Sequence, residues 1–448
     1  MDLSALLRSP LAGLFLRPAY DRLAVKAIAG LYFPLSRAWA AGLAADGDAE
    51  RLMAALPTFA GRRAAAGRAL DRLAPRARAY AAALAAWEDA LFAAGGGDGV
   101  LADLEHRRAA AAQSLMAGRL CFLGAHLRRR FPPIAWSVPG RDAVARRHGP
   151  RLASAAEAFA PGAVPQMETS RAIAEEGFET YWLRAPARVG GEADTLWARV
   201  EAPSAPGPHP VLVFTHGICM ESEFIYTIGS PSGELAASGL AVIRPEGPYH
   251  GRRRMRGFFG GEPVIALGPM GMLDYFEAHV RELAWLTAWA RTTFGGPVAV
   301  GGVSLGALAA QLAAVAAADW PAAMRPDAVF LVTGSQSVMA VVTEGALPRA
   351  LGAMPVLEAN GWPREAVEEW MPLLEPRGKP ALDGDRIVAL LGAHDEITPY
   401  GEGQHLMDSW SVPPANVFLR NSGHFTAALS LYRDPAPFER LRAVLQAG

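Results

Sequence analysis

Cysteine, lysine and long uncharged segments are scarce in this sequence of 448 residues, and the scarcity of cysteine and of uncharged segments argues against particular classes of protein. Only Cys121 and Cys219 occur, far apart and without Cys-x-x-Cys spacing, so we expect neither a disulfide framework nor a zinc site. This cysteine usage is typical of a reducing compartment and favours a cytoplasmic location. Near the N-terminus the longest uncharged run lies between Lys26 and Arg37, shorter than the ~20 residues that a membrane-spanning helix needs.

The charge of the chain is nearly balanced, with a formal net charge of −1. A net charge of this size implies no electrostatic attraction of the strength on which nucleic-acid binding depends, so we expect no nucleic-acid partner. Lys26 and Lys379 are the only lysines, and the abundance of arginine and alanine indicates a codon bias, so arginine clusters are weak evidence of function. With 51% hydrophobic and 19% charged residues, the chain can bury a large core and is long enough for one large domain and a second unit.

Residues 1–165 predict a helical region, because alanine, leucine and arginine dominate and no alternating strand pattern occurs. The apolar start of the chain includes Asp2 and Arg8 and shows no small-residue cleavage site, so we expect no signal peptide. Both an interfacial amphipathic helix and an ordinary buried helix fit this start. The arginines at 128–130 fit either anionic lipid or a solvated helix end. Peripheral membrane contact through this region is therefore a hypothesis, and the oligomeric state stays open.

Residues 166–448 predict a second domain of the α/β class. Segments 178–186 and 195–203 are rich in aromatic and β-branched residues and flank a Gly-Gly turn, which predicts an antiparallel pair of strands. Short apolar runs then alternate with helical stretches, a pattern that predicts a doubly wound, mostly parallel sheet with helices on both faces. The runs are PVLVF (210–214), LAVIR (240–244), PVAVG (297–301), AVFLV (328–332), RIVAL (386–390) and NVFLR (416–420).

Residues 336–382 interrupt this alternation between the fourth and fifth runs. The segment has a helical pattern and contains several methionine and tryptophan residues. An insertion at this place stands over the carboxyl ends of the strands, where α/β proteins bind ligands, so we expect a helical cap. A packed helical excursion without ligand contact is the alternative.

The third run leads into Gly302-x-Ser304-x-Gly306, followed by an alanine-rich helical segment at 307–318. A serine nucleophile on a sharp strand-to-helix turn needs this context of strand, flanking glycines and helix. The glycines allow the tight turn because they carry no Cβ atom. An ordinary strand-to-helix turn has the same appearance, so the motif alone does not decide between the two.

Two further polar groups follow later apolar runs. Asp395 comes just after the fifth run, and His424 just after the sixth. Because ligands bind at the carboxyl ends of the strands in such sheets, Ser304, Asp395 and His424 are expected at one edge, in the chain order of an α/β-hydrolase triad. In this arrangement His424 takes the proton of Ser304 and later delivers it to the leaving group, while Asp395 orients the imidazole.

The remaining parts of the site are expected close to this triad. The backbone N–H of Leu305 is one oxyanion donor, and the second comes from Ile218 or Cys219, in the loop after the first run. The residues expected to support the site are His216, Gly217, His250, Gly302 and Gly306. No metal and no organic cofactor are required by this chemistry.

Other residues of suitable types lie near these runs. Cys219 does not follow a glycine-flanked strand-to-helix turn, and Asp383 and Asp385 precede the fifth run, so none of the three suits the chemistry. Glu344 follows the fourth run and is an alternative acid. The residues His394 and His405 lack the glycine turn that precedes His424.

Four motifs in residues 170–446 together resemble the α/β-hydrolase superfamily. They are His216-Gly217, GGVSLGA (301–307), Gly392-x-x-Asp395-x-x-x-Pro399 and Gly423-His424. The stretches PYHGRRR (248–254) and TEGAL (343–347) are similar to the branch of abhydrolase-domain-containing proteins with an N-terminal helical arm. This chain has Glu246 where many relatives show aspartate, which leaves the triad intact but blurs the assignment to that branch.

The motifs and the resemblance favour a serine hydrolase of the esterase or lipase-like kind that cleaves a carboxylic ester through an acyl-enzyme. The apolar insertion and N-terminus favour a hydrophobic, lipid-like acyl group in a small-molecule or lipid substrate. An acyltransferase or a C–C bond hydrolase with the same triad is an alternative, because fold and triad do not separate these reactions. A non-catalytic binding or scaffold protein with this fold is a further alternative, although it would not need all three triad residues.

Overall fold

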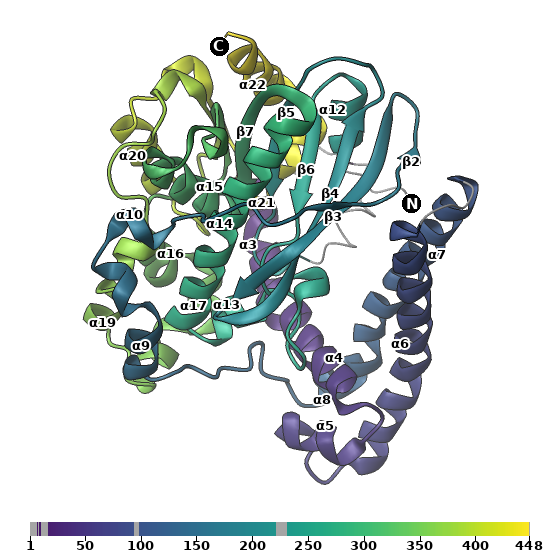
Figure 1. Ribbon diagram of the computed structural model, residues 1–448. Coiled ribbons are helices and arrows are strands. Elements are labelled where there is room, and N and C mark those ends of the chain that lie inside the picture. The colour runs from purple at the N-terminus through teal and green to yellow at the C-terminus, as the bar shows by residue number, and fades with distance from the viewer. Residues whose placement is uncertain (1–6, 8, 10–16, 94–97, 221–230, 448) are drawn as a thin grey trace.

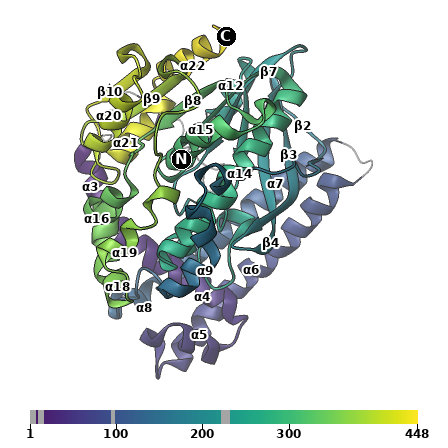
Figure 2. The ribbon, with the colours of Figure 1, turned by 60° about the vertical axis from the view of Figure 1, so that its left-hand side comes forward.

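The computed structural model describes residues 7, 9, 17–93, 98–220 and 231–447 (Figure 1). An N-terminal helical region packs against a domain built on one central sheet, and Figure 2 shows the same arrangement from a second direction. None of the helices in the described ranges is long and apolar enough to cross a membrane.

In the described part of the chain, ten strands form a single mixed sheet in the order β1-β3-β4-β6-β5-β7-β8-β9-β10, with β2 paired to β3. The strands from β6 to β10 pair in parallel, whereas β1, β3 and β4 pair antiparallel. The strands are β1 (Glu168–Thr169), β2 (Ile173–Ala174), β3 (Phe178–Val189), β4 (Glu192–Pro203), β5 (His209–Thr215), β6 (Ala241–Pro245), β7 (Gly295–Val303), β8 (Ala328–Val332), β9 (Ile387–Gly392) and β10 (Val417–Arg420).

This strand order is that of the α/β-hydrolase fold, and it confirms the predicted fold class. The antiparallel pair around the Gly-Gly turn is also confirmed, since β3 and β4 pair over their whole length. Each of the six apolar runs forms a strand, from β5 to β10.

The helices of this domain lie on both faces of the sheet (Figure 1). They are α12 (Ser232–Ala237), α13 (Glu262–Ala266), α14 (Pro269–Phe294), α15 (Leu305–Ala316), α16 (Val338–Glu344), α17 (Ala346–Leu351), α18 (Ala353–Ala359), α19 (Arg364–Glu368), α20 (Tyr400–Ser409), α21 (His424–Leu429) and α22 (Ala436–Gln446). The long helix α14 starts at a proline, which suits a first helical position, and ends at Gly295, whose φ of +65° suits glycine.

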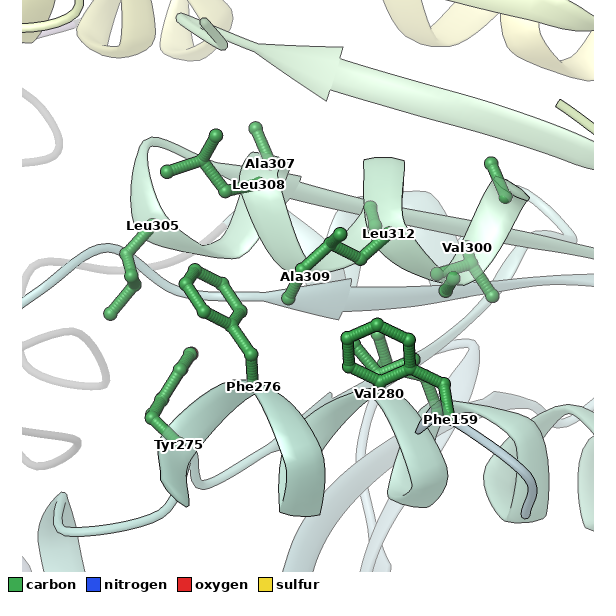
Figure 3. Packing of buried hydrophobic residues seen from close by; sticks show 14 of the residues in the cluster. Phe159, Tyr275, Phe276, Val280, Val300, Leu305, Ala307, Leu308, Ala309 and Leu312 are labelled. Carbon is green, nitrogen blue, oxygen red and sulfur yellow. The ribbon is translucent and has the colours of Figure 1, made fainter. Parts of the chain in front are cut away.

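The central strands are apolar on both sides because each side is covered by helices. Successive side chains of a strand point to opposite faces, so Val329 and Leu331 of β8 join the core against α14 and α15, whereas Phe330 joins the core against α22. Figure 3 shows part of the first core, where Leu305 and Leu312 of α15 lie above residues of α14. Helices therefore pack on both faces of the sheet and fix the positions of its strand ends.

The segment 336–382 is helical, as predicted, and supplies α16 to α19 between β8 and β9. Its helix α17 contacts the N-terminal region, where Leu347 and Leu351 share a core with residues of α4. The insertion thus lies beside the loop that follows β9, and the backbone N–H of Ala346 donates to the carbonyl of Glu396 at 2.6 Å.

The N-terminal region is helical, as predicted. Its elements are α3 (Pro18–Ala27), the π-helical turn η1 (Ile28–Tyr32), α4 (Phe33–Ala45), α5 (Ala49–Ala55), α6 (Arg63–Phe92), α7 (Asp98–Ala117), the 3-10 turn η3 (Gly118–Phe122), α8 (Leu123–Arg128), α9 (Arg141–Leu152) and α10 (Ala155–Ala158). Most of the apolar start of the chain, residues 1–16, lies outside the described residues, so its predicted alternatives are not addressed by the structure.

Two apolar clusters join this region to the sheet domain. In the first, α3 and α4 share a core with Cys219, Phe259 and Ile397, and the rings of Phe33 and Phe259 are 5.2 Å apart. In the second, Trp87 of α6 stands edge-on to Trp182 of β3 at 4.9 Å. The first cluster brings α3 and α4 to the carboxyl edge of the sheet, because Cys219 and Ile397 lie in loops at that edge.

Candidate active site

Ser304 stands between β7 and α15 with φ +57° and ψ −117°, a backbone conformation that residues with a side chain rarely adopt. Its N–H donates to the carbonyl of Val332 at 3.0 Å, and its carbonyl accepts from the N–H of Leu308 at 3.1 Å. These two bonds hold the strained turn in place. The geometry is that of a nucleophile elbow, with the side chain half-buried at the edge of the sheet.

The glycines of the motif are needed because other backbone lies against them. A Cβ atom on Gly302 would come within 2.5 Å of the backbone of Gly306, and one on Gly306 within 2.4 Å of the carbonyl oxygen of Thr215. Gly217 is also near the serine, but a Cβ atom there would lie 3.5 Å from Cβ of Ser304, which is an ordinary contact distance. The turn therefore requires small residues on both sides of Ser304.

Asp395 is buried in the loop after β9 and is fixed by several donors. Its Oδ1 accepts from the N–H groups of Ile397 and Thr398, both at 2.9 Å, and its Oδ2 accepts from the hydroxyl of Thr398 at 2.8 Å. A carboxylate with this many donors has one defined orientation.

His424 is buried and is the first residue of α21. Its Nδ1 lies 2.8 Å from Oδ2 of Asp395 and 3.1 Å from Oγ1 of Thr398. A hydrogen bond from Nδ1 to the carboxylate leaves Nε2 as the proton acceptor of a neutral ring. This is the arrangement that a general base needs.

A chain of contacts leads from Ser304 to His424. The N–H of Ser304 donates to the carbonyl of Val332, the last residue of β8. The carbonyl oxygen of the next residue, Thr333, lies 2.9 Å from the hydroxyl oxygen of Thr398, whose single proton is shared between this carbonyl and Asp395. Thr398 in turn lies beside both Asp395 and His424. No hydrogen bond joins Ser304 Oγ to His424 Nε2 in the part of the chain that the structure describes, and such contacts often tighten only when substrate binds.

The loop after β5 lies beside the elbow. Cys219 has a φ of +56°, and its N–H donates to Nε2 of His250 at 3.1 Å. This N–H is therefore directed at the imidazole and not at the serine. At the first position of α15, the N–H of Leu305 has no partner within its own helix. The identity of the oxyanion donors stays a prediction. Because the N–H of Cys219 is bonded to His250, the predicted donors are the backbone N–H groups of Leu305 and Ile218.

Two buried histidines connect this loop to the one after β6. Nε2 of His216 accepts from the N–H of Gly247 at 3.0 Å, and the rings of His216 and His250 are 4.6 Å apart. Nδ1 of His250 bonds the carbonyl of Pro248 at 2.8 Å. Burial, and then the neighbouring His216, hold the pKa of His250 well below its ordinary value, so its ring is neutral.

A polar network that the sequence did not reveal lies under the elbow. The hydroxyl of Thr215, at the end of β5, lies 2.5 Å from Nε2 of His279 on α14, and Nδ1 of His279 lies 3.2 Å from Glu282. Arg253 pairs with Glu282 and Asp194. Burial opposes the charge of Glu282, but Arg253 and His279 outweigh it and lower the pKa of this carboxyl. The network fixes Thr215, against which Gly306 packs.

Glu246 also has a structural partner. Its carboxylate accepts from the N–H and the guanidinium of Arg252, at 2.8 and 2.5 Å, and the guanidinium stacks near the rings of Trp87 and Trp197. The pair thus connects the loop after β6 to the N-terminal region.

The alternative residues lie at the surface. Glu344, Asp383, Asp385, His394 and His405 are all exposed. Nε2 of His394 bonds Oδ1 of Asn421 at 2.7 Å rather than any member of the predicted triad. Within the described residues, no group of three or more His, Cys, Asp or Glu is arranged to hold a metal ion.

A cavity of about 250 Å³ opens next to His424. Its wall is formed by α3, with Asp21 and Val25, by α17, with Ala346, and by Ile397 after β9. The N-terminal region and the insertion therefore both contribute to the surroundings of the predicted base.

Comparison of the sequence with protein-family models gives no match, and comparison with the curated proteins gives none either. Solved structures do match. An acetyl xylan esterase from a Thermoanaerobacterium species is 14% identical with a TM-score of 0.44, and the match covers 67% of this chain and 96% of the esterase. An acetyl xylan esterase from a Paenibacillus species is 15% identical with a TM-score of 0.47, and the match covers 65% of this chain and 92% of that esterase.

A third match is the acylaminoacyl peptidase of Pyrococcus horikoshii, with 10% identity, a TM-score of 0.38, and coverage of 60% of this chain and 40% of the peptidase. Identities below 25% and TM-scores below 0.5 do not establish the activity of this chain.

Proposed function

We propose that this chain is a serine hydrolase that cleaves carboxylic esters with Ser304, His424 and Asp395. The observation that carries the proposal is the 2.8 Å contact between His424 Nδ1 and the buried Asp395, at the same edge of the sheet as the strained turn of Ser304. A buried, oriented imidazole and a displayed serine are what acyl transfer requires.

The reaction follows from these positions. Nε2 of His424 takes the hydroxyl proton as Ser304 attacks the ester carbonyl, and the oxyanion is stabilised by the N–H groups of Leu305 and Ile218. The intermediate expels the alcohol, which receives the proton from His424 and leaves an acyl-serine. Water loses a proton to His424 as it attacks the acyl group, and the second tetrahedral intermediate then breaks its bond to Ser304 Oγ, which takes the proton back from His424 as the acid is released. Asp395 keeps the imidazole oriented and balances its charge in both halves.

The substrate we propose is an ester with a hydrophobic acyl group, small-molecule or lipid-like. The apolar residues of the insertion and of the N-terminal region support this choice. The cavity beside His424 has apolar surface from Val25, Ile397 and Ala346, but Ser304 is not part of its lining. The abhydrolase-domain branch with an N-terminal arm remains our proposed placement, supported by the PYHGRRR and TEGAL stretches. A cytoplasmic location is proposed from the scarcity of cysteine.

A fluorophosphonate probe tests the proposal directly, with the labelled peptide mapped by mass spectrometry. We expect label on Ser304 in the wild-type chain and none in Ser304→Ala or His424→Ala. Esters of increasing acyl length then define the substrate, and product analysis with added alcohol or amine distinguishes hydrolysis from acyl transfer. A folded wild-type chain without label would overturn the proposal and favour a scaffold.

We also propose that the N-terminal region contacts membranes. Tyr20, Leu23 and Leu31 are exposed large hydrophobic residues of α3 and η1, and Leu120 and Leu127 are exposed on η3 and α8. Exposed apolar side chains beside arginines are typical of a surface that meets anionic lipid.

Co-sedimentation with vesicles that contain anionic phospholipid measures this contact. Leu120→Ser combined with Leu127→Ser should reduce the bound fraction several-fold. The matched control is Leu419→Ser, which changes an exposed leucine of strand β10 in the sheet domain. Equal binding of both variants, or no binding by the wild-type chain, would remove the membrane hypothesis.

A further inference from the structure

The first turn of the N-terminal helix α3 contacts the helix that carries the predicted base. The carboxylate of Asp21 accepts from the backbone N–H of Phe425 at 2.5 Å and from that of Thr426 at 3.2 Å. Its second oxygen accepts from the hydroxyl of Thr426 at 2.6 Å. Asp21 is only 7% exposed, so these bonds are shielded from water. Figures 1 and 2 both show α3 beside α21.

These bonds are those of a helix N-cap, but they come from a distant part of the chain. A capping side chain normally precedes its helix directly and accepts from the second and third N–H groups. Helix α21 is preceded by Gly423, which has no side chain, and Asp21 takes over this role from more than 400 residues earlier. The N–H of Gly423 donates to Oγ1 of Thr426 at 2.9 Å, which completes the capping arrangement.

Gly423 and Asp21 are complementary in shape. A Cβ atom on Gly423 would lie 2.6 Å from Cγ of Asp21, a distance that real contacts do not reach. The backbone of Gly423 has a φ of −91° and a ψ of −158°, which any residue can adopt. Glycine is therefore required here by the position of the Asp21 carboxylate and not by the backbone.

We propose that Asp21 is a positioning residue of the active site, and that α3 is thereby an essential part of it. The proposal rests on the proposed function. His424 is the first residue of α21, directly before the two N–H groups that Asp21 holds. The orientation of α21 sets the position of the imidazole relative to Asp395 and Ser304. A shift of about 1 Å in a reacting group can reduce a rate by about 100-fold.

The other contacts of α3 support the same arrangement. Val25 packs in one core with Ile397, two residues after Asp395, and with Leu347 of the insertion. Asp21 and His424 line the same cavity. The helix thus touches the acid loop, the base helix and the insertion at once.

The first test compares Asp21→Ala with Asp21→Asn in the full-length chain. Asparagine is nearly as good a helix cap as aspartate, whereas alanine cannot accept the two N–H groups. We expect Asp21→Ala to lower kcat for a soluble p-nitrophenyl ester, and the rate of fluorophosphonate labelling, by about 10- to 100-fold, with KM within about twofold. Asp21→Asn should lose less than about fivefold. Hydrogen exchange of the Phe425 and Thr426 amides should accelerate in Asp21→Ala.

A matched control separates positioning from a general loss of stability. Asp48 caps α5 in the same N-terminal region, accepting from the N–H of Glu50 at 2.8 Å. Asp48→Ala removes an exposed cap of another helix in this region, so it should leave kcat within about twofold while lowering the melting temperature.

A second variant uses the complementarity of the two positions. Gly423→Ser alone should impair the enzyme, because its side chain meets the Asp21 carboxylate. In an Asp21→Gly background, which also removes the Cβ atom of residue 21 that would lie 2.9 Å away, the same serine has room and can cap α21 directly, so it should raise kcat several-fold over Asp21→Gly alone. The effect of Gly423→Ser therefore changes sign with residue 21, which identifies the contact between these two positions.

The outcomes are distinguishable. A wild-type chain that neither labels nor hydrolyses would overturn the proposed function and this proposal with it. A reactive wild-type chain with an unimpaired Asp21→Ala variant would overturn this proposal alone, as would equal losses in Asp21→Ala and Asp48→Ala at a temperature where both are folded.

Discussion

The backbone N–H of Cys219 donates to Nε2 of His250 at 3.1 Å, and this bond joins the loop after β5 to the loop after β6. A Cβ atom on Gly261 would come within 2.2 Å of the same nitrogen, so the imidazole is closely enclosed. The bond exists only while Nε2 of His250 carries no proton. The loop that borders Ser304 is therefore held by a histidine that must stay neutral.

Acid should weaken this hydrogen bond between the two loops. The pKa of His250 is well below its ordinary value in the folded chain and close to 6.5 in the unfolded chain, so the unfolded state binds the extra proton first as pH falls. The contribution to the free energy of unfolding is complete above about pH 6.5 and is lost progressively below it. His250→Gln, whose amide oxygen accepts a bond without titrating, should reduce the pH slope by up to about 1.4 kcal/mol per pH unit.

Denaturant unfolding between pH 5 and pH 8 measures this slope in both proteins. His279, which is also buried with a lowered pKa, leaves a residual slope in the variant. If the free energy of unfolding depended on pH equally in His250→Gln and in the wild-type chain, the pKa of His250 would not be lowered in the folded state.

The strained turn at Ser304 predicts an increase in stability on substitution by glycine. Ser304 has φ +57° and ψ −117°, a conformation that costs a residue with a side chain about 1–3 kcal/mol and costs glycine little. Ser304→Gly should raise the free energy of unfolding by about 1–2 kcal/mol while abolishing fluorophosphonate labelling. Ser304→Ala loses the same hydroxyl but keeps Cβ, so it should gain much less. Equal stability of the two variants would mean that the turn stores no strain.

Thr398 is expected to be important for both stability and rate. Its hydroxyl lies 2.8 Å from Asp395, 2.9 Å from the carbonyl of Thr333 and 3.1 Å from Nδ1 of His424. Thr398→Val keeps the shape but removes these bonds, which should lower the free energy of unfolding by about 1–3 kcal/mol and kcat by about tenfold.

Chemical denaturation and ester turnover measure the two effects. Thr343→Val is the matched control, because the hydroxyl of Thr343 bonds only the carbonyl of Met339 within its own helix. If Thr398→Val turned over substrate at the wild-type rate, the hydroxyl would not contribute to the orientation of Asp395 and His424.

The fold could be predicted from the sequence, and so could the residues that directly follow the strands, because both depend on local sequence patterns. Apolar runs identify β5 to β10, and parallel strands bring their carboxyl ends to one edge, so Asp395 and His424 could be placed together from sequence alone. The elbow at Ser304 has a short-range signature, because its flanking glycines pack against backbone.

The residues that hold these groups could not be found in the same way. Asp21 belongs to a helical stretch without a motif, and its contact with Thr426 joins segments more than 400 residues apart. The bond between Thr215 and His279 likewise depends on how α14 packs against β5. A single sequence records which residue types are present, but not which distant side chains meet, because that is decided by tertiary packing.

The far end of the N-terminal region should contribute stability without affecting the chemistry. Trp87 is fully buried, stands edge-on to Trp182 at 4.9 Å, and has the guanidinium of Arg108 4.8 Å above its ring. Trp87→Ala should lower the free energy of unfolding by about 3–5 kcal/mol, and Trp87→Phe, which keeps an aromatic ring, by clearly less. Denaturant unfolding gives these values, and kcat at 25 °C should stay within about twofold in both variants. A loss of kcat in Trp87→Ala as large as that in Asp21→Ala would mean that the whole region, and not the contact at α21, positions His424.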